Sequence, residues 1–136
     1  MITSRYLQPE DYELLSNSLA NDEYHSTTSP VFFVEPETIT LVYEDEKGPV
    51  MFVRGKGLEE GTRQTMQLDI QFCDNKDGKR NLKVMLEGFP PLTEKAKTNG
   101  FTEINFESSS PLLRKFCLKR LGFVEAAGQT LRYVVQ

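Results

Sequence analysis

A strand pattern, a helical pattern and a second strand pattern follow one another along the middle of the chain. The first strand, Thr65 to Phe72, alternates apolar and polar side chains, and the second covers Phe101 to Phe106. The segment between them carries apolar residues at the spacing of one helical face, namely Leu82, Met85, Leu86 and Phe89. Strands joined through a helix lie parallel in one sheet, so this stretch predicts a β-α-β unit.

Proline interrupts the helical pattern of this unit. Pro90 and Pro91 cannot donate a backbone hydrogen bond, and proline disfavours helix in the residue before it. We therefore expect the helix to kink or to restart at Leu92 and to finish at Asn99 and Gly100.

The remaining segments add further strands and two helices around the unit. Alternating patterns predict strands at residues 1–6, 38–43, 50–53, 123–125 and 131–135. One helix is expected to begin at Pro9, and another to run from Ser110 and Pro111 to Gly122. The polar segment 21–30 reads as a loop or a frayed helix beside a substrate groove, and the segment from Gly55 to Gly61 as a connection between strands.

Size and composition favour one soluble globular domain. The chain has 136 residues with 38% hydrophobic and 26% charged residues, which suffices for one packed core. We expect a single α/β (α+β) domain over residues 1–136.

Several partners and sites are not expected from this composition. A net charge of -4 argues against sequence-independent nucleic acid binding, and no apolar run is long enough to span a membrane. One histidine and two distant cysteines, Cys73 and Cys117, predict neither a metal site nor a disulfide. The N-terminus shows no signal-peptide pattern, so a cytoplasmic location is expected.

The order of elements, with Arg80, Gly100-Phe101-x-x-Ile104 and Leu121-Gly122-Phe123, resembles the GCN5-related N-acetyltransferase (GNAT) family over nearly the whole chain. The resemblance implies a mixed sheet in the order β-α-β-β-β-α-β-α-β and acetyl-CoA as co-substrate. The family's pyrophosphate loop, Arg or Gln followed by two spaced small residues, falls on the segment from Arg80 to Met85, so the resemblance implies cofactor contacts from Arg80, Asn81, Leu82, Lys83, Val84 and Met85. Lys83 and Met85 occupy the two small-residue positions.

Further site residues follow from the resemblance and from the expected strand ends. Acyl-CoA is expected between the strands ending near Phe72 and Phe106, with the backbone of Phe72 and Cys73 orienting the thioester carbonyl. The family's Asn near the start of the last helix falls near Ser110. The Tyr with which many family members protonate the departing thiolate falls on Leu118, and leucine has no proton to donate. The polar candidates for a general base at the strand ends are Asp69, Gln71 and Glu107, and His25 in the loop is a further, weaker candidate.

Two hypotheses of different classes remain open from the sequence. The first is a divergent N-acetyltransferase that moves an acetyl group from acetyl-CoA to a small-molecule or protein amine. The second is a non-catalytic GNAT-fold module that works by binding a protein partner, for example as a virion or host-interaction protein of a bacteriophage. The sequence predicts neither the acceptor nor the oligomeric state.

Overall fold

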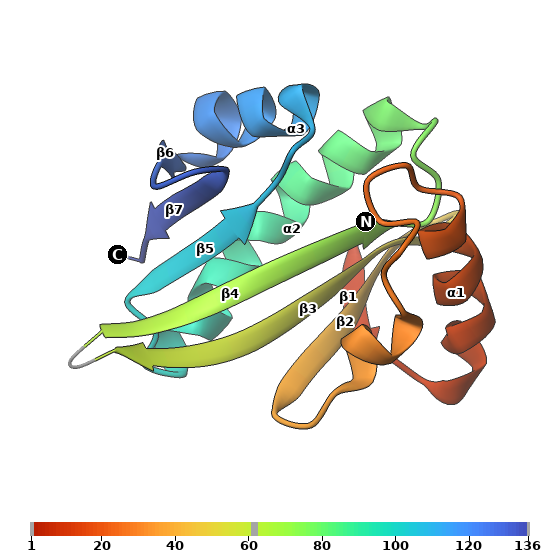
Figure 1. Cartoon of the computed structure of the whole chain (residues 1–136), viewed down its shortest axis with the longest axis horizontal. Coiled ribbons are helices and arrows are strands. Elements are labelled where there is room, and N and C mark those ends of the chain that lie inside the picture. Colours follow the sequence, from red (N-terminus) through yellow and green to blue (C-terminus); the bar gives the residue numbers. More distant parts are fainter. Residues whose placement is uncertain (1, 61–62, 136) are drawn as a thin grey trace.

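A mixed sheet runs through the computed structural model, which describes residues 2–60 and 63–135. In this described part the sheet has seven strands in the order β1-β2-β3-β4-β5-β7-β6 (Figure 1). The strands are β1 (Thr3–Tyr6), β2 (Thr38–Asp45), β3 (Gly48–Glu60), β4 (Arg63–Phe72), β5 (Glu103–Glu107), β6 (Val124–Glu125) and β7 (Thr130–Val134). Neighbouring strands pair antiparallel except β4 and β5, which are parallel. The predicted β-α-β unit and the α/β fold class are therefore confirmed.

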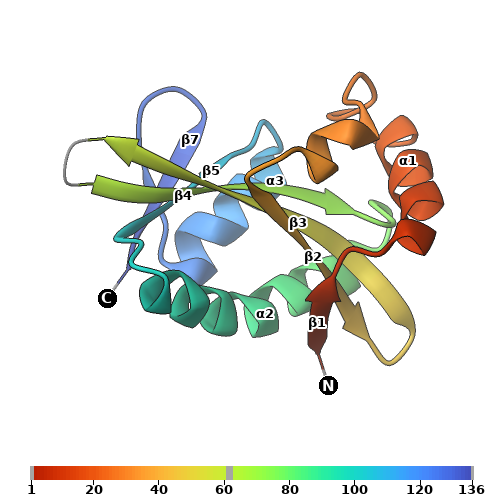
Figure 2. The same ribbon diagram turned by 90° about the horizontal axis from the view of Figure 1, so that it is seen from below.

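Helices cover both faces of the sheet. The elements are η1 (Pro9–Asp11), α1 (Tyr12–Ala20), η2 (Pro30–Val34), α2 (Gly78–Thr98), α3 (Pro111–Phe116) and the π-helical turn η3 (Cys117–Leu121). Figure 2 shows α2 on one side of the sheet and α1 on the other. The larger core cluster joins α2 and η3 to one face, and a smaller cluster joins Leu15 and Leu19 of α1 to Phe52 on the opposite face.

The third strand is longer than the sequence predicted. The expected connection from Gly55 to Gly61 is wrong over residues 55–60, because β3 continues to Glu60 and pairs with β4 over this length, while Gly61 lies outside the described residues. A Cβ at Gly55 would lie 3.6 Å from the Met66 sulfur, and one at Gly57 would lie 3.2 Å from the Phe101 ring. These glycines therefore give space to neighbouring side chains rather than turning the chain.

The second helix also differs from its prediction. Of the two alternatives at Pro90 and Pro91, a kink or a restart at Leu92, the restart is wrong, because α2 runs without a break from Gly78 to Thr98. Both prolines are exposed, so the carbonyl groups that lose their hydrogen-bond donors lie on the solvent side. Leu92 and Ala96 stay buried and continue the apolar stripe of the first half. Packing of this stripe on the sheet outweighs the local preference of the prolines.

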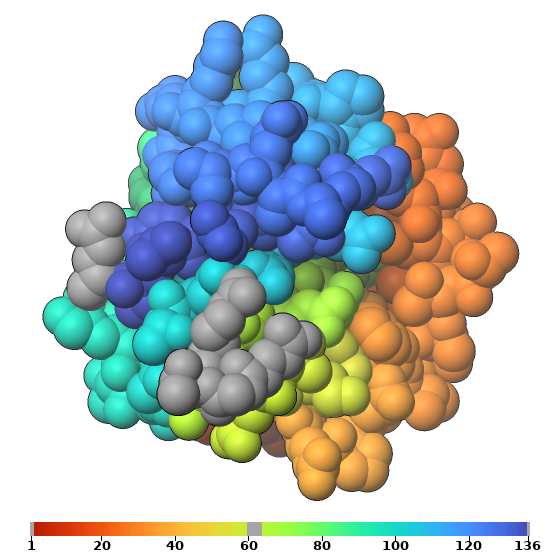
Figure 3. Space-filling model, turned by 60° about the vertical axis from the view of Figure 1, so that its left-hand side comes forward, coloured from red at the N-terminus to blue at the C-terminus, as the bar shows by residue number. Residues whose placement is uncertain are grey.

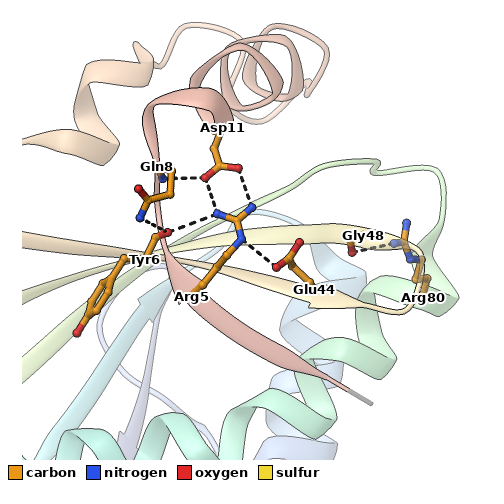
Figure 4. A network of polar contacts seen from close by, with 7 residues as sticks. All are labelled: Arg5, Tyr6, Gln8, Asp11, Glu44, Gly48 and Arg80. Atoms are coloured by element: carbon orange, nitrogen blue, oxygen red, sulfur yellow. Dashed lines mark hydrogen bonds and ion pairs between the residues drawn. The ribbon is translucent and has the colours of Figure 1, made fainter.

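An arginine in β1 joins the N-terminal strand to η1 and to β2 (Figure 4). The two terminal nitrogens of Arg5 donate to Asp11 at 2.6 and 2.8 Å, and its Nε donates to Glu44 at 2.9 Å. Asp11 also accepts the Gln8 amide at 2.7 Å. The hydrogen bonds from Arg5 hold the pKa of Asp11 below its ordinary value of 3.8.

Replacing Asp11 should reveal a pH-dependent contribution to stability. A carboxyl with a lowered folded pKa stabilises the protein above its ordinary pKa, and this contribution is lost as pH falls through the folded value. Asp11→Asn should therefore lower the free energy of unfolding at neutral pH by about 1–2 kcal/mol, given that Arg5 is partly exposed. Urea denaturation should show the two proteins converging in acid. An equal difference at neutral and strongly acidic pH would contradict this explanation.

A second stability prediction concerns the contact between α2 and β2. A Cβ added at Gly88 would lie 2.9 Å from the ring of Tyr43, which is 3% exposed and cannot move into solvent. Gly88→Ala should therefore destabilise the protein by about 1–3 kcal/mol through overpacking, despite the higher helix propensity of alanine. Gly78→Ala in the same helix is the matched control, since a Cβ there meets nothing within 4 Å. Equal unfolding midpoints for the two variants would refute the clash.

Candidate functional site

β4 and β5 separate toward their carboxyl ends. Their pairing ends with Leu68 opposite Phe106. Beyond Leu68, β4 continues against β3 as far as Phe72, while β5 ends at Glu107. A cleft of about 750 Å³ opens where the strands part.

Segments far apart in the sequence form the walls of this cleft. They are the loop after α1, the end of β4, the loop into α2, and the end of β5 with the start of α3. In the space-filling view, the orange segment after α1 and the blue C-terminal part flank the green and cyan surface of β4 and β5 (Figure 3). The cleft thus lies at the carboxyl ends of the central parallel strands.

The first turn of α2 presents main-chain donors beside the cleft. Asp77 precedes the helix, and its side chain accepts the Arg80 amide at 3.3 Å. The Asn81 amide donates to the Asp77 carbonyl at 3.0 Å. Within the described residues, the amides of Gly78 and Lys79 have no hydrogen-bond acceptor, as expected at a helix N-terminus. Gly78 and Lys76 line the cleft, and a Cβ at Gly78 would enter open space.

The amide positions expected for a pyrophosphate are corrected by this helix start. The sequence placed the receiving amides on Asn81 to Met85, but these residues lie inside α2, where each amide donates to a carbonyl four residues earlier. Val84 and Met85 are buried in the core, and Lys83 is exposed outside the cleft lining. The available donors lie earlier, at Gly78 and Lys79, because the helix begins before the segment that resembles the family loop.

Arg80 has another partner than the one expected. Its Nε and Nη2 both donate to Asp45 at 2.7 Å, and Nη2 also donates to the Gly48 carbonyl at 3.2 Å. These hydrogen bonds place the Asp45 pKa well below its ordinary range. Arg80 therefore joins α2 to the β2–β3 turn and does not line the cleft. A phosphate contact from Arg80 stays a prediction.

The backbone of Phe72 and Cys73, which was expected to orient the thioester carbonyl, is only partly available for hydrogen bonding to a ligand. The Cys73 amide donates to the Val50 carbonyl at 2.8 Å, so it is already occupied. Main-chain amides point alternately to the two edges of a strand. The Cys73 amide points to β3, so the amides of Ile70 and Phe72 point to the opposite edge of β4, where β5 is no longer paired. Both residues line the cleft. Burial raises the pKa of the Cys73 thiol to about 12, so this cysteine is a poor nucleophile.

Of the other predicted cofactor residues, Asn81, Leu82 and Ser110 line the cleft. The Asn81 side chain donates to the Asp74 carbonyl at 2.8 Å and so shapes the loop into α2. The Ser110 hydroxyl accepts the Leu113 amide at 3.4 Å and caps α3, as predicted. Leu118 packs against the larger core cluster. Ligand contacts of these residues stay predictions.

Both predicted bases, Asp69 and Glu107, lie at the cleft. Asp69 forms an ion pair with Arg54 at 3.1 Å. Desolvation raises the Asp69 pKa despite the opposing charge of Arg54. The structure thus brings the two carboxylates to one cleft.

A buried arginine that the sequence analysis missed holds η2 against the sheet. Arg54 is 3% exposed, and its Nε donates to the Phe32 carbonyl at 2.8 Å. Its guanidinium lies 3.8 Å from the centre of the Phe32 ring and pairs with Glu35 and Asp69. The only sequence signal was a charged residue within an apolar strand run.

A second missed cluster surrounds His25. Its Nδ1 lies 2.6 Å from Gln71 Oε1 and 3.1 Å from Asp22 Oδ2. Gln71 is fully buried, Asp22 is 4% exposed, and Asp22 and His25 line the cleft. The sequence named His25 and Gln71 as weak candidates but gave no sign that they meet, because 46 positions separate them.

Metal and membrane features are not found in the part of the chain that the structure describes. Over residues 2–60 and 63–135, no three His, Cys, Asp or Glu side chains are placed to hold a metal ion. None of the helices within these ranges has the length and apolar character needed to cross a membrane.

Solved structures share this fold at low sequence identity. An aminoglycoside 6'-acetyltransferase type Ii matches with a TM-score of 0.73 and 14% identity over 98% of this chain and 97% of its own. An aminoglycoside acetyltransferase in complex with coenzyme A has a TM-score of 0.72 and 14% identity, covering 98% and 95%. The ribosomal-protein-S18-alanine N-acetyltransferase from Escherichia coli has a TM-score of 0.70 and 13% identity, covering 100% and 95%.

The chain has the GNAT fold. Its described strands and helices follow the order expected from the resemblance, with one further strand at the C-terminal end, and the match covers nearly the whole length of these structures. No family model matches the sequence, and no curated protein matches it. At this level of identity the likeness concerns the fold.

Proposed function

We propose that this protein is an N-acetyltransferase that transfers an acetyl group from acetyl-CoA to an amine. One observation carries the proposal: β4 and β5 part beyond Leu68 and Phe106, and the first turn of α2 lies beside the resulting cleft. Open α/β sheets bind ligands at the carboxyl ends of their strands. The solved neighbours include one bound to coenzyme A, and their names include an aminoglycoside and a ribosomal-protein alanine, both of which carry amines.

The chemistry of the cleft suits a diphosphate. The amides of Gly78 and Lys79 offer two donors at the positive end of the α2 dipole, and Lys76 adds a charge at the cleft wall. These residues would hold the phosphates of acetyl-CoA.

The thioester would lie along the exposed edge of β4. The amides of Ile70 and Phe72 face this edge and would donate to the pantetheine arm or to the thioester oxygen. Acetyl-CoA supplies an activated acyl group, so the protein mainly has to place an amine beside it. Asp69 and Glu107 lie where that amine would enter.

Binding of acetyl-CoA tests the proposal directly. Calorimetry should show saturable binding to the wild type, and the ligand should raise the unfolding temperature. Gly78→Pro removes one amide donor at a position where proline suits a helix, so it should lower affinity roughly tenfold or more. Gly78→Ala keeps the amide and is the matched control, with affinity close to that of the wild type.

Two results would count against this function. The absence of binding heat at high acetyl-CoA concentration would refute the acetyltransferase hypothesis and favour the hypothesis of a protein-interaction module. Equal affinity for Gly78→Pro and Gly78→Ala would show that the α2 amides do not hold the ligand.

A further inference from the structure

His25 is the single histidine of the chain and lies in the wall of the cleft. It belongs to the turn after α1, where its own amide donates to the Asp22 carbonyl at 3.0 Å. Its side chain is 40% exposed, while the two groups beside its Nδ1 are buried. The imidazole therefore lies between the open cleft on one side and the buried side chains of Gln71 and Asp22, here called the buried anchor, on the other.

The tautomer of this imidazole follows from its neighbours. The Gln71 side chain donates through Nε2 to the carbonyls of Phe72 and Ser18, at 2.9 and 3.3 Å, which turns its Oε1 toward the ring. Asp22 presents a carboxylate oxygen to the same ring nitrogen. Both groups can only accept a hydrogen bond, so Nδ1 carries the hydrogen and Nε2 keeps its lone pair.

Asp22 is fixed as an ionised group. Desolvation raises its pKa, but hydrogen bonds from the Asn75 side chain and the Tyr24 amide outweigh this and leave the pKa below its ordinary value. The Tyr24 amide donates to Oδ1 at 2.9 Å, leaving Oδ2 for the ring. A buried carboxylate in this position orients an imidazole and stabilises its protonated form.

We infer that His25 is the general base of the proposed acetyl transfer, with Nε2 as the proton acceptor and Asp22 as the positioning residue. The inference rests on the proposed function. Nδ1 faces the buried anchor, so Nε2, on the far edge of the ring, faces outward. Within the described residues, Nε2 has no hydrogen-bond partner. A substrate amine in the cleft can therefore reach it.

The proton balance gives His25 one defined step. An amine enters as an ammonium ion and gives one proton to Nε2. Its nitrogen then forms the C–N bond at the thioester carbonyl carbon, the C–S bond breaks, and the second proton goes to the departing thiolate. The products are an amide, free coenzyme A and an imidazolium, which returns its proton to water.

Other charged groups face the same space from each neighbouring element. They are Asp22 and Glu23 on the turn, Asp69 on β4, Glu107 at the end of β5 and Lys76 before α2. Asp69 is already paired with Arg54. His25 is the group whose acceptor atom is both oriented and without a partner in the part of the chain described, which favours it over the two carboxylates as the base.

Nuclear magnetic resonance can test the geometry without any substrate. Because the chain has one histidine, long-range proton–nitrogen spectra of histidine-labelled protein report His25 alone. The neutral ring should carry its hydrogen on Nδ1. Hydrogen on Nε2 would overturn the inference, since the acceptor atom would then be blocked.

Kinetics test the role itself, with diaminobutane as the probe amine and release of free coenzyme A as the readout. His25→Asn should lower kcat roughly 10²–10⁴-fold, leave acetyl-CoA affinity by calorimetry unchanged, and remove the acidic limb of the pH profile. Asp22→Asn should lower kcat less and move that limb to lower pH, a change that a purely structural role would not cause. Ser26→Ala, at an exposed neighbour outside the cleft, is the control and should behave as the wild type.

The outcomes separate the two proposals. Failure of the wild type to bind acetyl-CoA removes the proposed function and the role of His25 with it. If the wild type binds acetyl-CoA but His25→Asn does not slow the release of coenzyme A, the role of His25 is refuted and the proposed function is not. If His25→Asn loses activity but Asp22→Asn keeps the pH profile of the wild type, the positioning role of Asp22 is refuted.

Discussion

The separation of β4 from β5 determines where this protein can act. Parallel strands satisfy their backbone groups through each other, and that pairing stops at Leu68 and Phe106. Beyond this point the free edge of β4, the first turn of α2 and the turn after α1 face a common space. The residues with proposed roles, apart from Lys79, line the cleft that opens where the strands diverge.

Periodic patterns predicted most of the architecture. The alternation in β4, the stripe of α2 and the Ser-Pro start of α3 are local signals, and each predicted an element of the correct type, although α2 begins earlier than expected. The effects of the prolines of α2 and of the glycines of β3 depend on their neighbours in space, so local rules predict them wrongly. Pro90 and Pro91 point to solvent, and Gly57 makes room for Phe101, which is distant in sequence.

The candidate site was harder to predict for the same reason. Asp69 and Glu107 could be placed because they lie near the carboxyl ends of the two predicted parallel strands. The start of α2 could not be located to within a turn, and this displaced the expected amide donors from Gly78 and Lys79 to positions inside the helix. The contact of His25 with Gln71 joins a loop to a buried strand and leaves no local pattern.

The outer strands of the sheet have a consequence for the behaviour of the protein in solution. β1 spans four residues and β6 two, so little unpaired backbone is presented at either border. The guanidinium of Arg5 further ties β1 down to Asp11 and Glu44. Short, charged borders disfavour strand addition by another molecule, which protects a sheet of this size against edge-to-edge aggregation.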